Sequence, residues 1–225
     1  MKKNITFAIA VIFIVIQGAC QSPNKKNKEL ENIAQKKQVL VQVDYQDGYE
    51  RAYFASGCFW CVEAIYESLK GVKEAIAGYS GGHIDNPTYE SSNTGLTGHA
   101  EAVEVVYDPS VIPFKDLVDV YFGSQVVSQV NGQGPDNGTQ YRSIIFYQNK
   151  EQKKIIQAKI AVLEEKLGKG NVAAQVLPFQ KFWVAEKYHQ DYEKLNPDNP
   201  YIQKVSIPRL KRCQGKFPHL LKQEY

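Results

Sequence analysis

Residues 51–80, RAYFASGCFWCVEAIYESLKGVKEAIAGYS, predict a strand, a helix and a second strand in direct succession. The first strand, 51–55, ends at the turn-forming pair Ser56-Gly57. Apolar residues then recur at helical spacing, at Cys58, Val62, Ile65, Tyr66 and Leu69. Gly71 ends this helix, and the next strand covers 72–79. Such a βαβ unit indicates a fold that mixes helices with a sheet.

The rest of the chain continues this mixed pattern. Further strands are expected at 102–107, 141–147, 172–179 and 181–183, and helices at 114–122, 151–167 and 188–195. Polar, Gly-rich loops are expected at 81–100 and 123–140, and loops of that length in a compact domain are usually functional or disordered. The order of elements predicts an α+β, two-layer sandwich in which helices pack on a mixed, mainly antiparallel sheet with a ferredoxin-like core.

The composition is that of a globular domain. The chain has 225 residues, of which 43% are hydrophobic and 23% charged, and it contains 4 Cys, which excludes a disordered chain and a disulfide-dense miniprotein. Two of the 27 Lys and Arg residues lie at positions 2 and 3, so the remainder carries 25 basic against 24 acidic side chains. A domain so close to neutral gives no reason to expect a nucleic-acid partner.

The N-terminus has the layout of an export signal. A basic start precedes the apolar run 5–16, which is too short for a membrane span of roughly 20 residues. Gly18-Ala19-Cys20 resembles the lipobox of bacterial lipoproteins, so we expect removal of residues 1–19 and acylation of Cys20; simple cleavage near Ala19 is the alternative. Residues 20–40 are then a flexible tether, and 41–225 the functional domain with a C-terminal tail. This predicts an exported, periplasmic protein, lipid-anchored to a membrane.

Cys58 and Cys61 are the first candidates for chemistry. Cys58 lies where a strand turns through Gly57 into a helix, and backbone N–H groups at a helix start favour an anion. Cys61 follows one helical turn later, which is within disulfide reach in C-x-x-C redox motifs. The alternative is that both are small buried apolar residues. Their position and the aromatic residues between them favour a reactive pair.

The motif Gly57-Cys58-Phe59-Trp60 resembles the signature of the A-type peptide methionine sulfoxide reductases. Further segments match the same family in the same order: Gly78-Tyr79-Ser80-Gly81-Gly82 with Asn86-Pro87-Thr88-Tyr89, Gly98-His99-Ala100-Glu101, Gly138-Thr139-Gln140-Tyr141-Arg142-Ser143, and the stretch from Ala185 to Tyr192. The resemblance covers roughly residues 50–200. It implies thiol-dependent reduction of methionine-S-sulfoxide in proteins, and of the free amino acid, without a bound cofactor or metal.

The resemblance implies a role for each matching residue. Cys58 would attack the sulfoxide sulfur, and Glu101 would protonate the sulfoxide oxygen. Phe59 and Trp60 would form the apolar wall that holds the substrate methyl group. Tyr89 and Tyr141 would hydrogen-bond the oxygen, and Asp136 would help to order the site. A sulfoxide oxygen is a poor leaving group, so the reaction needs an acid, and a Glu stays protonated at neutral pH only in a desolvated pocket.

Without the motifs, these residues have simpler interpretations. Glu101 would be a solvated carboxylate at the edge of a strand, and the aromatic residues would be core packing. Asp136 would be an ordinary residue of a Gly-rich turn. His99 and His189 are expected to be structural or hydrogen-bonding residues.

The recycling thiol is where this chain departs from its relatives. Many of them carry a Cys after the Asn-Pro of the C-terminal segment, but here Asn199-Pro200 is followed by Tyr201. Cys61 and Cys213 therefore remain as candidates to resolve the Cys58 sulfenic acid, with direct external reduction as a third route. Export excludes the cytosolic thioredoxin, so we expect an exported thioredoxin-like electron donor. The protein is expected to be a monomer that acts on oxidised proteins.

Two other classes of protein compete with this interpretation. A general C-x-x-C thiol-disulfide oxidoreductase would reduce disulfides without dependence on a sulfoxide. A non-enzymatic lipoprotein would bind a metal or a partner through the two Cys and a His, but the four His residues are scattered along the chain. Neither class accounts for the segments that contain Glu101, Tyr89 and Tyr141.

Overall fold

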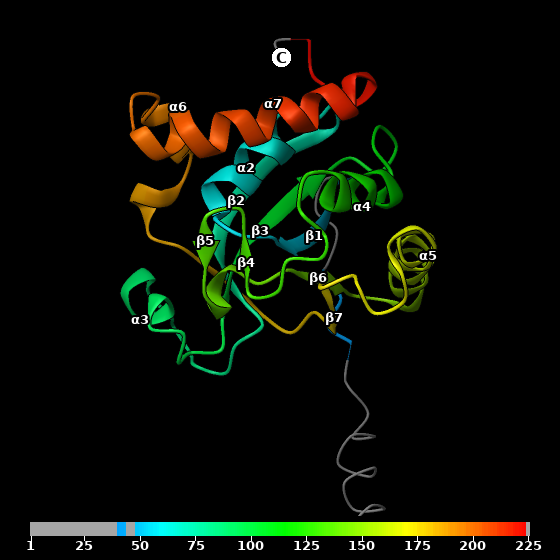
Figure 1. Ribbon diagram of the computed structural model, residues 1–225, viewed down its shortest axis with the longest axis horizontal. Helices are drawn as coiled ribbons and strands as arrows, with labels where there is room; N and C mark the ends of the chain where they lie inside the picture. Colours follow the sequence, from blue (N-terminus) through cyan, green and yellow to red (C-terminus); the bar gives the residue numbers. More distant parts are fainter. Residues whose placement is uncertain (1–39, 44–47, 224–225) are drawn as a thin grey trace, which may run out of the picture. The chain divides into compact units, whose positions relative to one another are not determined.

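The computed structural model describes residues 40–43 and 48–223 (Figure 1). The expected signal peptide 1–19, the acylation site Cys20 and the tether up to residue 39 lie outside the described residues. Within the described ranges, we find no helix that is both long enough and apolar enough to cross a membrane.

A six-stranded sheet forms the centre of the domain. Its strands are β1 (Glu50–Ala55), β2 (Val72–Ser80), β3 (Ala100–Tyr107), β6 (Ile144–Tyr147), β7 (Gln175–Pro178) and β8 (Phe182–Val184), in the spatial order β7-β6-β1-β3-β2-β8. All neighbours are antiparallel except β6 and β7. The helix α2 (Phe59–Glu67) connects β1 to β2. The helix α4 (Phe114–Gly123) lies in the connection from β3 to β6. This is the ferredoxin-like connectivity, and the predicted fold class is confirmed.

The two faces of the sheet have different covers. Val103, Val105 and Tyr107 on β3 belong to the larger core, which the apolar sides of α2 and α4 complete. The alternate residues of β3 face a smaller cluster, in which the ring of Phe179 stacks on Tyr53 at 3.8 Å between centroids. Glu101 has the same parity as Val103, so it lies on the helix-covered face.

Several predicted boundaries differ from the structure, and two of the differences concern the segments that contain Tyr89 and Tyr141. The expected loop 81–100 contains a short helix, α3 (Tyr89–Asn93), closed by a capping box between Thr88 and Ser91. A single helical turn is too short to show apolar periodicity, so this helix was not predicted. The strand expected from residue 141 begins at Ile144, because Thr139–Tyr141 forms a 3₁₀ turn, η1. Tyr141 is therefore held by a turn rather than by the sheet.

The remaining elements up to residue 195 include a short hairpin inside the expected loop 123–140. They are the hairpin β4 (Gly132–Gln133) and β5 (Asp136–Asn137), the long helix α5 (Lys150–Leu167), the 3₁₀ turn η2 (Lys187–His189) and the short helix α6 (Tyr192–Leu195). The single helix expected over 188–195 is broken at Asp191, whose φ is +53°.

The C-terminal segment, expected only as a tail, is helical. A π-helical turn, η3 (Ile202–Ser206), continues into α7 (Ile207–Lys216), and the 3₁₀ turn η4 (Pro218–Leu220) follows. Figure 1 shows α7 lying across α2. Its buried positions include polar residues, Ser206 and Arg209, so the apolar period was not evident in the sequence.

Candidate active site

The two thiols lie at the start of α2. Cys58 is the N-cap residue, and it follows Gly57, whose φ is +84°. A Cβ at this glycine would approach the Cβ of Gln133 to 2.5 Å, so only glycine allows the turn to pass under the loop. Cys58 is 6% exposed and Cys61 is 1% exposed. The sequence therefore places both sulfur atoms in a protected site rather than on the surface.

The two thiols interact with each other, which couples their protonation. The hydrogen bond from Cys58, together with the positive charge of Arg209 and the hydroxyls of Ser206 and Tyr201, lowers the pKa of Cys61 to about 7 against the opposing effect of burial. Burial, followed by its interactions with Cys61 and Glu101, raises the pKa of Cys58 well above its usual value. The pair therefore releases one proton near neutral pH and holds the second tightly. The helix start alone pointed to Cys58 as the acidic thiol, whereas the surroundings favour the charge on Cys61.

Glu101 contacts the first turn of the same helix. The backbone N–H of Phe59 donates to Glu101 Oε2 at 3.0 Å, and the side chain is only 2% exposed. Burial raises the pKa of Glu101 to about 8, against the effect of that N–H, and the charges of Asp136 and Cys61 raise it further. The carboxyl group thus keeps its proton at neutral pH, as an acid in a desolvated pocket must.

Tyr89 and Tyr141 reach the same place from different elements. Tyr89 begins α3 and Tyr141 ends η1, and both interact electrostatically with Glu101 and Cys58. Burial raises the pKa of both phenols, so both keep their protons and can donate hydrogen bonds at neutral pH. Asp136 interacts with Tyr141 and Glu101, and burial raises its pKa as well.

Aromatic rings line one side of the thiol pair. Phe59 is 1% exposed, and its ring centroid lies 6.4 Å from Tyr89 and 4.8 Å from His189. Trp60 stacks on Tyr192 at 3.7 Å between centroids. This wall is apolar and is contributed by α2, α3, η2 and α6. It has the chemistry to hold a thioether or methyl group.

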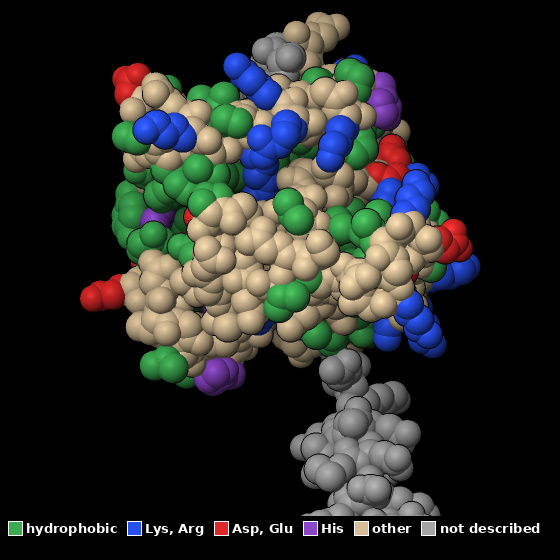
Figure 2. All heavy atoms as spheres, viewed as in Figure 1, with side chains coloured by type: hydrophobic (Ala, Val, Ile, Leu, Met, Phe, Trp, Pro, Cys, Tyr) green, Lys and Arg blue, Asp and Glu red, His purple; other side chains and the backbone are tan. Residues whose placement is uncertain are grey.

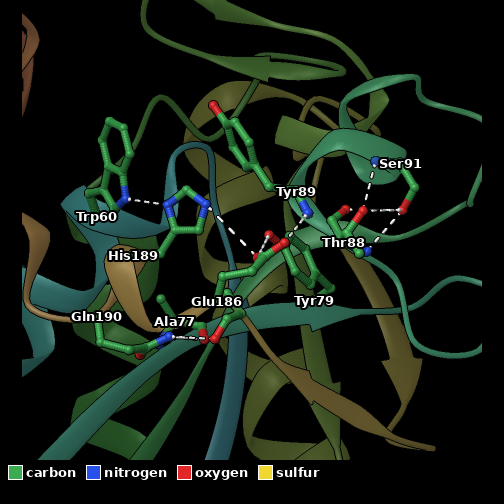
Figure 3. A network of polar contacts seen from close by, with 10 residues as sticks. Trp60, Ala77, Tyr79, Thr88, Tyr89, Ser91, Glu186, His189 and Gln190 are labelled. Carbon is green, nitrogen blue, oxygen red and sulfur yellow. Dashed lines mark hydrogen bonds and ion pairs between the residues drawn. The ribbon is translucent and has the colours of Figure 1, made fainter.

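A polar network behind this wall fixes its members (Figure 3). Trp60 Nε1 donates to His189 Nδ1 at 3.1 Å, and His189 Nε2 lies 4.0 Å from Glu186 Oε2. Glu186 accepts from the backbone N–H of Tyr89 at 2.8 Å and from the Tyr79 hydroxyl at 2.9 Å. The network thus ties Trp60 to Tyr89 through two residues of the segment that follows β8. His189 is a hydrogen-bonding residue, as the sequence analysis expected.

Comparisons with known proteins agree with this site. The family model described as peptide methionine sulfoxide reductase matches residues 50–220. The chain belongs to that family. The peptide methionine sulfoxide reductase MsrA of Saccharolobus solfataricus is 43% identical over 173 residues, which cover 77% of this chain and 97% of that protein. The resemblance predicted from the motifs is confirmed, and so is the enzyme class, peptide-methionine (S)-S-oxide reductase.

Solved structures of the family have the same fold. Methionine sulfoxide reductase A of Corynebacterium diphtheriae is 34% identical, with a TM-score of 0.62 and coverage of 71% of this chain and 81% of that one. Mxr1 of Saccharomyces cerevisiae in its reduced form is 31% identical, with a TM-score of 0.63 and coverage of 71% and 94%. The sulfoxide reductase fold thus extends over the domain that holds both thiols.

Two residues of this reductase site escaped the sequence analysis. The Tyr201 hydroxyl donates to Asp136 Oδ2 at 2.6 Å and lies 3.7 Å from Cys61 Sγ. Arg209 is 6% exposed and donates to the Ser124 carbonyl at 2.9 Å and to Ser56 Oγ at 3.1 Å. The sequence signal for this helical segment was the spacing of its buried residues, which lie at 202, 206, 209 and 213.

Cys213, the other candidate resolving thiol, lies on α7 of the reductase. It is 3% exposed, and burial raises its pKa to about 11. A thiol of that pKa is almost entirely protonated at neutral pH, which makes it a poor nucleophile compared with Cys61. Among the described residues, no group of three or more His, Cys, Asp and Glu side chains is arranged to hold a metal ion.

Proposed function

We propose that this reductase repairs methionine-S-sulfoxide in oxidised proteins outside the cytoplasm, and that it also accepts the free amino acid. In this proposal it works through a Cys58 sulfenic acid and then a disulfide. The observation that carries the proposal is the contact between Glu101 and the Phe59 amide. It places a buried, protonated carboxyl group beside the residue that follows the nucleophilic thiol.

The first step transfers oxygen from the substrate to Cys58. The Cys61 thiolate takes the proton of the neighbouring Cys58, and the Cys58 thiolate bonds to the sulfoxide sulfur. Glu101 donates its proton to the oxygen, and the hydroxyl is transferred to Cys58 as the S–O bond of the substrate and the transient bond between the two sulfurs break, which leaves methionine and a Cys58 sulfenic acid. The substrate sulfur gains two electrons and Cys58 loses two. Glu101 then recovers a proton from Cys61.

The surrounding residues orient the sulfoxide for this step. Phe59 and Trp60 hold the methyl group, while the hydroxyls of Tyr89 and Tyr141 hydrogen-bond the oxygen as it gains charge. Asp136 orders the site through its hydrogen bond with Tyr201.

The second step forms a disulfide. The Cys61 thiolate attacks the Cys58 sulfenic acid, and the hydroxyl leaves as water after taking a proton. Cys61 is favoured over Cys213 because it already contacts Cys58 and has the lower pKa. A thioredoxin-like protein in the same compartment then reduces the disulfide, and the chain is held at the membrane through acylated Cys20. It acts as a monomer, without a resident cofactor.

The reaction is tested with the purified protein, dithiothreitol and racemic methionine sulfoxide, with each epimer followed by chiral chromatography. We expect loss of the S form alone, because one face of the sulfoxide fits between the aromatic wall and Glu101. Consumption of both epimers, or of neither, contradicts the proposal. Reduction of insulin disulfides at a similar rate without sulfoxide consumption would identify a general thiol-disulfide oxidoreductase instead.

Cys61→Ser separates the two steps. We expect the variant to form one methionine per protein molecule, more slowly than normal because Ser cannot take the Cys58 proton, and then to turn over at least about tenfold more slowly still with a dithiol protein reductant. Quenched-flow assays of methionine, with mass spectrometry of the protein, measure both steps. Cys213→Ser is the matched control and is expected to keep normal turnover. A slow second phase in the Cys213→Ser variant alone would assign the resolving role to Cys213.

A further inference from the structure

A cavity of about 450 Å³ lies between α7, η3 and the loop that contains β4 and β5. Its lining includes four basic side chains, those of Lys204, Arg209, Arg212 and Lys216. The carboxyl group of Asp136 and the redox thiol Cys61 also line it. The residues of α7 that take part are three and four positions apart, so they share one face of the helix. The cavity is large enough to accept a group of ligand size.

The positive charge of this basic cavity is not neutralised within the described part of the chain. Lys204, Arg212 and Lys216 are exposed, and no described carboxylate forms an ion pair with any of the four basic residues. Arg209 and Lys216 donate to uncharged groups, among them the carbonyls of Ser124 and Gly123. Figure 2 shows Lys and Arg side chains gathered over α7 on this face. The chain outside its first 19 residues is close to neutral, so this is a local feature.

The cavity and the aromatic wall reach different sulfur atoms. Cys61 lines the basic cavity, whereas Cys58, Phe59, Trp60 and Glu101 do not. The substrate side of the pair is therefore apolar and aromatic, and the Cys61 side is polar and positive. A thiol that reduces a Cys58–Cys61 disulfide has to approach one sulfur in line with the S–S bond, with the other sulfur as the leaving group. From the cavity, the sulfur that it meets is Cys61.

We propose that the basic cavity is the docking site for the protein reductant, and that it selects a dithiol protein with carboxylates beside its active-site thiol. The proposal rests on the Cys58–Cys61 disulfide of the proposed function. The partner's thiolate bonds to Cys61, and Cys58 leaves as a thiolate and takes a proton. The partner's second thiol then attacks the mixed disulfide and releases Cys61. The two enzyme sulfurs gain two electrons in total, and the partner's dithiol is oxidised to a disulfide.

The charges act in two ways on this reaction. Complementary charge speeds association of the two proteins, and this effect weakens as salt screens it. Positive charge next to Cys61 also stabilises the partner's thiolate as it approaches. Carboxylate-bearing partners suit this face better than neutral or basic ones.

The test uses the complete protein, oxidised by excess methionine sulfoxide without reductant, with the disulfide verified by peptide mass spectrometry. Reduction is then followed in stopped flow with a thioredoxin-class protein whose active-site dithiol is flanked by carboxylates. The double variant Lys204→Glu with Arg212→Glu is expected to react about tenfold more slowly at low ionic strength, and the difference is expected to shrink in high salt. A thioredoxin-class protein with Lys in place of those carboxylates is expected to recover the rate with the double variant.

The matched control is Lys166→Glu with Lys169→Glu, which makes the same change in net charge at exposed positions at the end of α5. It is expected to react at the normal rate. Equal rates for the two double variants, or no recovery with the reversed partner, overturn the cavity proposal. A change confined to small thiol acids such as 3-mercaptopropionate, with the protein reductant unaffected, also overturns it. Absence of the Cys58–Cys61 disulfide before reduction is a different result, and it contradicts the recycling step of the proposed function.

Discussion

Cys58→Ser is expected to abolish sulfoxide reduction, with a loss on the order of a thousandfold or more. A serine hydroxyl at this position is not ionised near neutral pH, and oxygen cannot take up the sulfoxide oxygen as a sulfenic acid does. Cys58 is also the N-cap of α2 without a side-chain capping bond, so the change removes no cap and the fold is expected to persist. Methionine formed in the first turnover, measured by quenched flow, is the direct measurement.

The control for this variant is Cys61→Ser, which changes the neighbouring thiol in the same helical turn. It is expected to complete one turnover while Cys58→Ser completes none. If Cys58→Ser still produced one methionine per molecule, the nucleophile would be another thiol, and the assignment of Cys58 would be wrong. Thermal unfolding of both variants verifies that the comparison is between folded proteins.

Glu101→Ala is expected to reduce activity by about a hundredfold or more, whereas Glu101→Gln is expected to remain within about tenfold of normal. Glutamine can accept the Phe59 N–H with its oxygen and donate its own N–H towards the sulfoxide, which reproduces both hydrogen bonds of a protonated Glu101. Alanine does neither, and it leaves the Phe59 amide without an acceptor. First-turnover rates with saturating sulfoxide make the comparison, and equal rates for the two variants would contradict the role of Glu101 as acid and donor.

The same variants give a pH signature. The reaction needs a deprotonated thiol pair, with a pKa near 7 for Cys61, and a protonated Glu101, with a pKa of about 8. Activity is therefore expected to rise towards pH 7 and to fall above pH 8, and Glu101→Gln is expected to lose the alkaline decline.

Because Glu101 binds its proton more tightly in the folded state, its contribution to stability falls as pH rises from about 4.5 to 8. Glu101→Gln is expected to remove this loss, so unfolding measured at pH 5 and pH 9 provides an independent check.

The sequence was most informative where structure is local. The segment 51–80 contains its own strand, turn and helix patterns, so β1, α2 and β2 could be predicted from residues close together in the chain. The helix α7 could not, because its buried face contains Arg209, whose burial depends on carbonyl and hydroxyl partners more than 80 residues away. Whether a polar residue is buried depends on such partners, which sequence periodicity does not record.

The site shows the same division. The motifs predicted the residues around Cys58, Glu101 and Tyr89, and the helix start pointed to Cys58 as the acidic thiol. The lowered pKa of Cys61 depends in part on Tyr201 and Arg209, which reach it from η3 and α7. Charge at a buried thiol is set by whatever the fold brings within a few ångströms. That information is absent from a four-residue motif.

The two-sided approach to the thiol pair has a kinetic consequence. Where sulfoxide and reductant bind at the same site, an excess of sulfoxide slows the enzyme by binding to the disulfide form, and an excess of reductant slows it by binding to the reduced form. In the proposed cycle, the sulfoxide approaches Cys58 beside the aromatic wall, and the reductant approaches Cys61 from the basic cavity. Methionine therefore need not leave before the electron donor docks. This predicts a two-site ping-pong scheme. A heavily oxidised protein that presents many sulfoxides at once then does not block reduction of the enzyme's disulfide.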